Sequence, residues 1–254
     1  MSAPLTGRFD DPIQAPGTEE RLWREWSGWA GLPEITLPRS GRVVVVAAHP
    51  DDEVLGFGGS LALLAASEAE VTVVVLTDGE GSHPHSRTVT PEELVRLRAA
   101  ETRAALAELG AAHVQVVRWG VADTEVAKHE RRITERLHPL VTGAALVVAP
   151  WTGDVHSDHE AAGRAALAAA GDAATPCWHY PVWMWHWARP DDPRVPWHRA
   201  ARVTLTEPVR ARKRAAVARY ASQIRPLGPD PEDAAILPPE EIAHHLRERE
   251  VVFR

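Results

Sequence analysis

Two short stretches of this sequence gather side chains that bind metals and transfer protons. The first follows four consecutive Val residues, and the second follows another apolar run further along the chain; they contain His49, Asp51, Asp52 and Glu53, then Asp154, His156, Asp158 and His159. Burying so many ionisable groups at the ends of core strands costs free energy unless they bind something. Imidazole and carboxylate groups are metal ligands. The sequence therefore predicts a metal site.

The elements that must position these residues alternate along the chain. We expect strands near 42–47, 71–77, 113–117 and 144–149, and helices near 60–68, 91–109, 128–140 and 159–170. This order predicts a three-layer α/β domain with a mostly parallel sheet. Ligands bind at the carboxyl ends of such strands. If the first and fourth strands are neighbours, both stretches open on one edge of the sheet.

On that edge, His49, Asp52 and His159 could hold one metal ion. Two imidazoles and one carboxylate leave a position for water, as a catalytic metal requires. Such a metal lowers the pKa of its bound water to about 7. Asp51 could then deprotonate the water, and His156 could stabilise the oxyanion or protonate the leaving nitrogen. A His-x-x-His pair or an Asp-Asp pair alone is weak evidence for a site. Two clusters that each follow a Val-rich strand favour a functional site.

Three motifs resemble the signatures of a known family, the PIG-L/LmbE-like zinc-dependent N-acetylglucosaminyl deacetylases. They are His49-Pro50-Asp51-Asp52-Glu53, Gly56-Phe57-Gly58-Gly59 and His156-Ser157-Asp158-His159, within roughly 42–170. The resemblance implies a Rossmann-like α/β/α domain that removes an N-acetyl (acyl) group by attack of a metal-bound water. It implies Zn²⁺, or another divalent metal such as Fe²⁺, on His49, Asp52 and His159, with Asp51 as general base and His156 at the oxyanion.

Further residues have expected roles around that centre. The resemblance implies that Asp158 orients His156 or His159. We expect Glu53 to hold the loop through a hydrogen bond and Asp154 to support the metal ligands without touching the metal. Two positions are expected to bind substrate: Arg98, like the family's helical Arg, and Asp123, like an Asp that hydrogen-bonds sugar hydroxyls. A surface ion pair and a loop cap are the structural alternatives for these two.

The composition of the chain limits which partners and which location are expected. The net charge of −7 argues against nucleic acid binding, and no apolar run approaches the roughly 18 residues of a membrane-spanning helix. The polar first residues predict no signal peptide, and the single Cys177 excludes internal disulfides. We therefore expect a cytoplasmic enzyme for a small amino-sugar substrate, with no nucleic acid partner and no membrane insertion, compatible with a homo-oligomer.

The chain is expected to form one domain, 1–254. It divides into an N-terminal arm and helix (1–38), the motif-bearing α/β core (39–170) and an aromatic-rich C-terminal part (171–254). Ten Trp residues are unusual beside three Phe and two Tyr. Trp183, Trp185 or Trp187 could stack on a sugar, although packing across a capping element is the competing interpretation.

Other functions remain open at this point. The same motifs would suit an amidase that cleaves a thiol conjugate or another amide-linked sugar. A nucleotide-binding Rossmann module is suggested by Gly56, Gly58 and Gly59 with Asp78, but the spacing differs from Gly-x-Gly-x-x-Gly. The carboxylates of Asp51 and Asp52 would also repel a pyrophosphate. A non-catalytic metal-binding protein would not need both the base and the second His.

Overall fold

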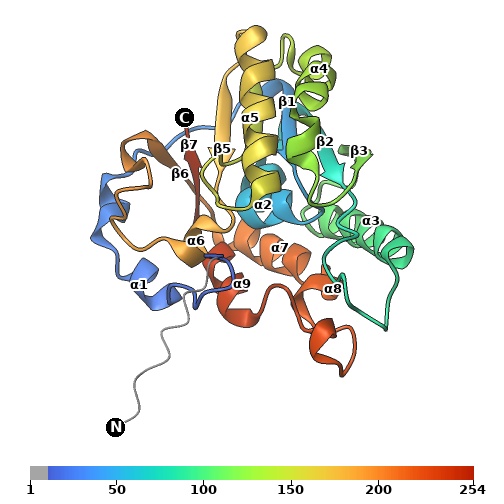
Figure 1. Ribbon diagram of the computed structural model, residues 1–254. Helices are drawn as coiled ribbons and strands as arrows, with labels where there is room; N and C mark the ends of the chain where they lie inside the picture. Colours follow the sequence, from blue (N-terminus) through green and yellow to red (C-terminus); the bar gives the residue numbers. More distant parts are fainter. Residues whose placement is uncertain (1–10) are drawn as a thin grey trace.

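The computed structural model describes residues 11–254 and places a seven-stranded sheet at the centre of the molecule (Figure 1). The strand order is β3-β2-β1-β4-β5-β7-β6. Their bounds are β1 Ser40–Ala47, β2 Glu68–Thr77, β3 Gln115–Val121, β4 Leu146–Pro150, β5 Cys177–Tyr180, β6 Ala200–Thr204 and β7 Arg249–Phe253. Only β7 runs antiparallel to its neighbours. The predicted mostly parallel sheet is therefore confirmed, while the first ten residues of the predicted arm lie outside the described part.

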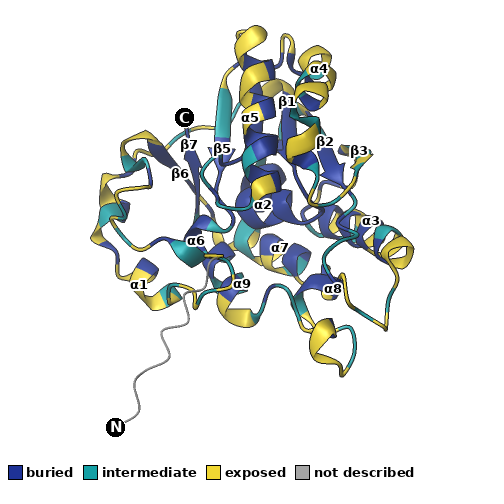
Figure 2. Ribbon diagram, viewed as in Figure 1, coloured by how far each residue is buried: buried dark blue, intermediate teal, exposed yellow. Residues whose placement is uncertain are grey.

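Helices cover both faces of this sheet. Side chains alternate along a strand, so Val43 and Val45 pack with α2, α3 and α7, whereas Val44 and Val46 pack with α4 and α5. Figure 2 shows the strands buried between these layers. The predicted α/β/α layering is confirmed. The helices are α1 Glu20–Arg24, α2 Asp52–Ala65, α3 Pro91–Glu108, α4 Glu130–Val141, α5 Ser157–Asp172, α6 Met184–Trp187, α7 Glu207–Val217, α8 Ala221–Ile224 and α9 Pro239–His245.

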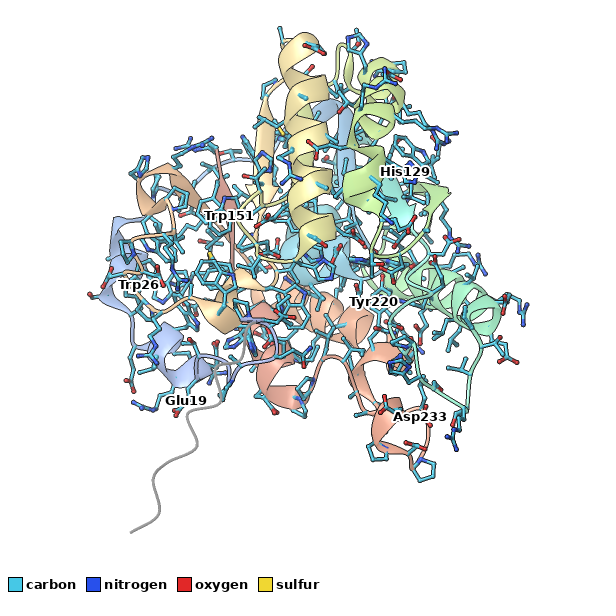
Figure 3. The ribbon with its side chains drawn as sticks, in the orientation of Figure 1. Glu19, Trp26, His129, Trp151, Tyr220 and Asp233 are labelled. Carbon is cyan, nitrogen blue, oxygen red and sulfur yellow. The ribbon has the colours of Figure 1, made fainter. Side chains whose placement is uncertain are left out.

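Short 3₁₀ turns and a tryptophan cluster complete the fold. The turns are η1 Ser27–Gly31, η2 Val126–His129, η3 Trp197–Arg199 and η4 Pro231–Asp233. The single helix predicted within 1–38 is instead α1 followed by η1. Its buried Trp23, Trp26 and Trp29 join Trp185 in a separate core beside β6 and β7; Trp26 and Trp151 are labelled in Figure 3. Core packing is therefore the role of Trp185.

The helix predicted to begin at Ser60 begins at Asp52, and this corrects the sequence interpretation. We expected a loop because glycine is a poor helix former. The glycines instead allow close packing: a Cβ on Gly56 would lie 2.1 Å from Tyr180 Cδ2, and one on Gly59 would lie 2.5 Å from Leu205 Cδ1. Because Gly56, Gly58 and Gly59 lie inside a helix, they do not form a loop that could cradle a phosphate.

The position of β1 brings the two polar stretches together. It lies between β2 and β4 and is parallel to both, which confirms that the first and fourth strands are neighbours. The loops after β1 and β4 therefore open on the same carboxyl edge of the sheet. None of the helices within residues 11–254 combines the length and apolar character needed to cross a bilayer.

Candidate metal and active site

Three side chains converge at the carboxyl edge of β1 and β4. His49 Nδ1 lies 3.2 Å from His159 Nε2, and Asp52 Oδ1 lies 3.2 Å from the same His159 nitrogen. Asp52 Oδ2 lies 3.6 Å from His49 Nδ1. Ligands about 2.1 Å from a tetrahedral zinc ion stand about 3.4 Å apart. The spacing of these three groups therefore fits one cation.

The outer nitrogens of both imidazoles face carboxylates. His159 Nδ1 lies 2.7 Å from Asp154 Oδ2. His49 Nε2 lies 3.1 Å from Asp123 Oδ1 and 3.2 Å from Asp158 Oδ2. When each outer nitrogen donates its proton to a carboxylate, the inner nitrogen keeps a lone pair for a metal. The donor set therefore has the hydrogen bonding that metal-binding histidines show.

The elements fix these groups through backbone hydrogen bonds. Asp52 stands in the first turn of α2, where its Oδ2 accepts the backbone N–H of His49 at 2.8 Å. Asp154 accepts the backbone N–H groups of Val182, Trp183 and Met184 at 2.9–3.0 Å. The carboxylate that orients His159 is thus held by the segment after β5.

The buried imidazoles and carboxylates of this cluster shift one another's pKa values. Burial opposes the charged form of His49, but hydrogen bonds to Asp123, Asp158 and Asp52 raise its pKa well above its usual range. Burial likewise opposes ionised Asp52, yet His159 and His49 hold its pKa well below the usual range. A positive charge is therefore favoured between these carboxylates, as a bound cation would supply.

Asp51 lies beside this centre, and its pKa is shifted in the opposite direction from that of Asp52. Burial raises the pKa of Asp51 to about 7, against the opposing charge of Arg98. Arg98 Nη2 lies 2.9 Å from Asp51 Oδ2 and also donates to the carbonyl oxygen of Pro50. Glu53 Oε2 accepts the backbone N–H of Asp51 at 3.2 Å, and Tyr220 donates to Glu53 Oε1 at 2.7 Å. Arg98 and Glu53 therefore hold Asp51 in place.

His156 forms the N-cap of α5 above the same cluster. Its Nδ1 accepts the backbone N–H of Asp158 at 3.3 Å. Burial, with the charges of His159 and His49, lowers the pKa of His156 to about 2. A neutral ring with an accepting Nδ1 carries its proton on Nε2, so His156 is suited to donate a hydrogen bond. Its ligand atom lies within 4.8 Å of those of His49 and His159, but ligation through Nε2 would require the other tautomer.

Asp158, Asp123 and Arg98 make contacts that the sequence did not indicate. Asp158 contacts His49 rather than His156 or His159 through its side chain, and its carboxylate also accepts the backbone N–H of Thr124 and Val126. Asp123 accepts from the backbone of Gly81 and Thr124 besides facing His49. Arg98 is buried against Asp51 rather than on the surface. Sequence spacing does not reveal these partners because they come from different loops.

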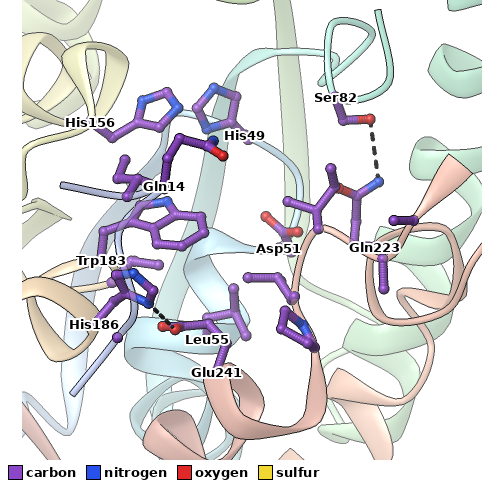
Figure 4. A pocket seen from close by; sticks show the side chains of 18 of the residues that line it. Gln14, His49, Asp51, Leu55, Ser82, His156, Trp183, His186, Gln223 and Glu241 are labelled. Carbon is purple, nitrogen blue, oxygen red and sulfur yellow. Dashed lines mark hydrogen bonds and ion pairs between the residues drawn. The ribbon is translucent and has the colours of Figure 1, made fainter. Parts of the chain in front are cut away.

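A cavity of about 1040 Å³ opens over the cluster (Figure 4). The C-terminal part supplies wall residues that the motifs did not indicate: Trp183, His186, Gln223 and Glu241. Of the three Trp residues considered for stacking, Trp183 lines this cavity, whereas Trp187 stacks on Trp151. In the sequence, only the density of aromatic residues around Trp183 indicated this wall.

The loop after β2 forms the opposite side of the cavity. His83 in this loop is buried, and its Nε2 faces the carbonyl oxygen of Ala234 at 3.1 Å. This contact joins the loop to the C-terminal segment before α9. The cavity is therefore closed by segments far apart in the sequence.

Comparisons with known proteins agree with this fold. The chain is 27% identical over 216 residues to the 1D-myo-inositol 2-acetamido-2-deoxy-alpha-D-glucopyranoside deacetylase 1 of Catenulispora acidiphila, covering 72% of this chain and 64% of that protein. It is 28% identical over 140 residues to the diacetylchitobiose deacetylase of Thermococcus kodakarensis, covering 53% and 51%. The chain thus spans less than two thirds of the length of these relatives.

A solved structure extends the likeness in fold. The crystal structure of the A40926 pseudoaglycone deacetylase superposes with a TM-score of 0.64 at 22% identity, covering 85% of this chain and 97% of that one. The family described as PIG-L, GlcNAc-PI de-N-acetylase, matches residues 44–170, half of the chain and the part that contains both polar stretches. This protein belongs to the PIG-L family.

Proposed function

We propose that this protein is a metal-dependent hydrolase that removes the N-acetyl group, or another acyl group, from an N-acetylglucosaminyl-type substrate. The observation that carries the proposal is the convergence of His49, Asp52 and His159 beside the Asp51 carboxylate. These groups lie on the floor of a cavity large enough for a sugar. The deacetylase names of the relatives support the same reaction.

Each residue has a task that its contacts support. His49, Asp52 and His159 would hold the cation, and two imidazoles with one carboxylate suit Zn²⁺ while also accepting Fe²⁺. When bound, the cation activates water and polarises the amide carbonyl. Asp51 accepts the proton of the attacking water and passes it to the leaving nitrogen. His156 donates from Nε2 to the oxygen on which negative charge develops.

The remaining residues around the site position these groups. Asp154 fixes the ring of His159, and Asp123 with Asp158 fixes the ring of His49. We also propose that 1–254 acts as a single domain, since the wall over the site comes from both ends of the chain. The cytoplasmic location and a homo-oligomer stay predictions.

The test is zinc-dependent release of acetate. Metal-stripped protein is incubated with N,N′-diacetylchitobiose, and acetate is measured before and after zinc is added. We expect release only with zinc, and at least a hundredfold less from Asp51→Asn because the proton acceptor is lost. Asp172→Asn, an exposed carboxylate at the end of α5, serves as the control and should match the wild type.

Two outcomes would contradict the proposal. One is release at the wild-type rate by metal-stripped Asp51→Asn protein. The other is the absence of zinc-dependent acetate release from every N-acetylglucosaminide in a panel that includes an inositol glycoside. A thiol-conjugated amide in the same panel distinguishes a deacetylase from the amidase, because the motifs are common to both.

A further inference from the structure

The C-terminal wall of the cavity contains a charged group that the proposed reaction does not use. We propose that Glu241 and Trp183 bind a protonated amine on the part of the substrate beyond the scissile acetamide. The substrate would then be an N-acetylated sugar linked to an amine-bearing residue, such as a second amino sugar. This inference rests on the proposed deacetylation and specifies its substrate class.

Glu241 has an oxygen that lacks a partner. Its side chain is buried, with 3% of the residue exposed, and it lines the cavity. Oε2 lies 2.7 Å from His186 Nδ1, whereas Oε1 has no hydrogen-bond partner among residues 11–254. An unpaired buried carboxylate oxygen is costly. A donor from a ligand in the cavity would satisfy it.

Trp183 supplies an aromatic face in the same wall. Its backbone N–H is held by Asp154 Oδ2, which also orients His159. Figure 4 shows its indole between the rings of His49 and His156 on one side and the pair formed by His186 and Glu241 on the other. The rings of Trp183 and His186 have their centroids 5.8 Å apart. An indole and a carboxylate together favour an ammonium group, through cation–π attraction and a charge-assisted hydrogen bond.

The charge of the cavity mouth selects the same ligand. The described lining includes three carboxylates that form no ion pair within residues 11–254: Asp11, Glu232 and Glu240. Arg98 is the one Lys or Arg side chain of that lining, and it is already bonded to Asp51 and to the carbonyl oxygens of Pro50 and Gly79. Away from the metal site, a phosphate or carboxylate on the substrate would therefore face these carboxylates without a compensating Lys or Arg.

His186 does not reverse this balance. Its Nδ1 faces Glu241 and its Nε2 lies 2.8 Å from the carbonyl oxygen of Ala15, so both nitrogens face acceptors. The hydrogen bond to Glu241 raises the pKa of His186. A protonated His186 compensates the charge of Glu241 and also interacts favourably with Asp11, but it leaves Glu232 and Glu240 without a counter-ion. An ammonium group thus remains the favoured ligand.

The experiment compares two disaccharides that differ at one carbon. N-acetylglucosaminyl-glucosamine carries a protonated amine on its second sugar, and N-acetylglucosaminyl-glucose carries a hydroxyl there. With zinc-loaded protein we expect a KM about tenfold lower for the amine disaccharide. Glu241→Gln should raise that KM about tenfold while the KM for the glucose disaccharide stays within about twofold. Glu70→Gln, an exposed carboxylate on β2, is the charge-matched control.

A binding measurement separates this inference from the proposed reaction. Calorimetry with Asp51→Asn protein measures the affinity for both disaccharides without hydrolysis. Adding the conservative substitution Trp183→Phe should lower the affinity for the amine disaccharide only. Tighter binding of the amine disaccharide by this variant, together with no acetate release by the zinc-loaded wild type, would support the subsite and reject deacetylation. Equal KM and equal affinity for both disaccharides, or an equal effect of Glu70→Gln and Glu241→Gln, would overturn the subsite.

Discussion

Asp51 carries its carboxylate on a strained backbone. Its φ of 126° lies in a region that side chains with a Cβ rarely adopt. The surroundings impose this conformation: Glu53 accepts the Asp51 N–H, and Val54 and Leu55 donate to its carbonyl oxygen at 2.9 and 2.8 Å. The strain turns the carboxylate toward the cavity and Arg98. At this residue the fold gives up stability to place a proton acceptor.

Replacing Asp51 by Gly and by Ala measures that strain. Both variants lose the carboxylate and its contact with Arg98, but only glycine adopts this backbone without a steric penalty. We expect Asp51→Gly to be more stable than Asp51→Ala by about 1 kcal/mol, after the entropy cost of glycine is included. Urea unfolding of the two zinc-loaded proteins gives the difference. Equal stability, or a more stable Ala variant, would show that the backbone relaxes.

At the residue scale, the sequence predicted ligand types better than their supporting contacts. His49, Asp52 and His159 could be grouped because two polar stretches follow neighbouring parallel strands. The partners of Arg98 and Asp158 could not, since each contact joins a helix residue to a loop from another part of the chain. Glu241 had no motif at all. Its place in the cavity depends on α9, which packs over the site from the end of the chain.

Among the elements, α2 joins the metal site to the C-terminal part. The carbonyl oxygen of Leu55 accepts a hydrogen bond from Lys213 Nζ at 2.8 Å. Glu250 accepts the backbone N–H groups of Gly59 and Ser60 and pairs with Lys213 at 2.6 Å. A buried ion pair from α7 and β7 thus contacts the helix whose first turn carries Asp52. Periodicity could not predict this, because β7 reaches the sheet from the far end of the sequence.

Gly56 tests how closely α2 must approach the sheet. Tyr180 cannot move aside easily, because it is fully buried and its hydroxyl donates to the carbonyl oxygen of Val46 at 2.7 Å. We expect Gly56→Ala to lower the free energy of unfolding by about 1–3 kcal/mol, as overpacked cores do. Gly171 in α5 is the matched control, since a Cβ there meets nothing within 4 Å.

The control should change stability in the opposite direction. Gly171→Ala gains helix propensity, so we expect up to about 1 kcal/mol of added stability. Thermal and urea unfolding of both variants give the comparison. If Gly56→Ala were as stable as Gly171→Ala, close packing against Tyr180 would not be the reason for glycine at this position in α2.

Across the whole molecule, segments near the two ends of the described residues 11–254 meet beside the cavity. Glu20 in α1 accepts from Arg247 Nη2 at 2.6 Å and lies 2.8 Å from His244 Nδ1 in α9. Arg247 also lies 4.3 Å from the ring centroid of Trp185. The tryptophan cluster and this ion pair therefore fasten the N-terminal segment to the helix that carries Glu241. The family match covers residues 44–170 and includes neither Glu20 nor α9.

The pH dependence of stability reports on this connection. Burial would raise the pKa of Glu20, but hydrogen bonds to His244 and Arg247 lower it from 4.5 to about 2. Because the pKa is lowered on folding, the stabilisation is fully present above pH 4.5 and is lost as the pH falls through about 2. Glu20→Gln should therefore be less stable than the wild type at pH 7, with a difference that shrinks below pH 4.5.

The control is Glu19, an exposed carboxylate 3.8 Å from Arg21. Glu19→Gln should show almost no difference from the wild type at pH 7 or below pH 4.5. Urea unfolding from pH 7 to pH 3 checks both variants, and a difference for Glu20→Gln that stays constant over this range would mean that the charge of Glu20 does not join the two ends.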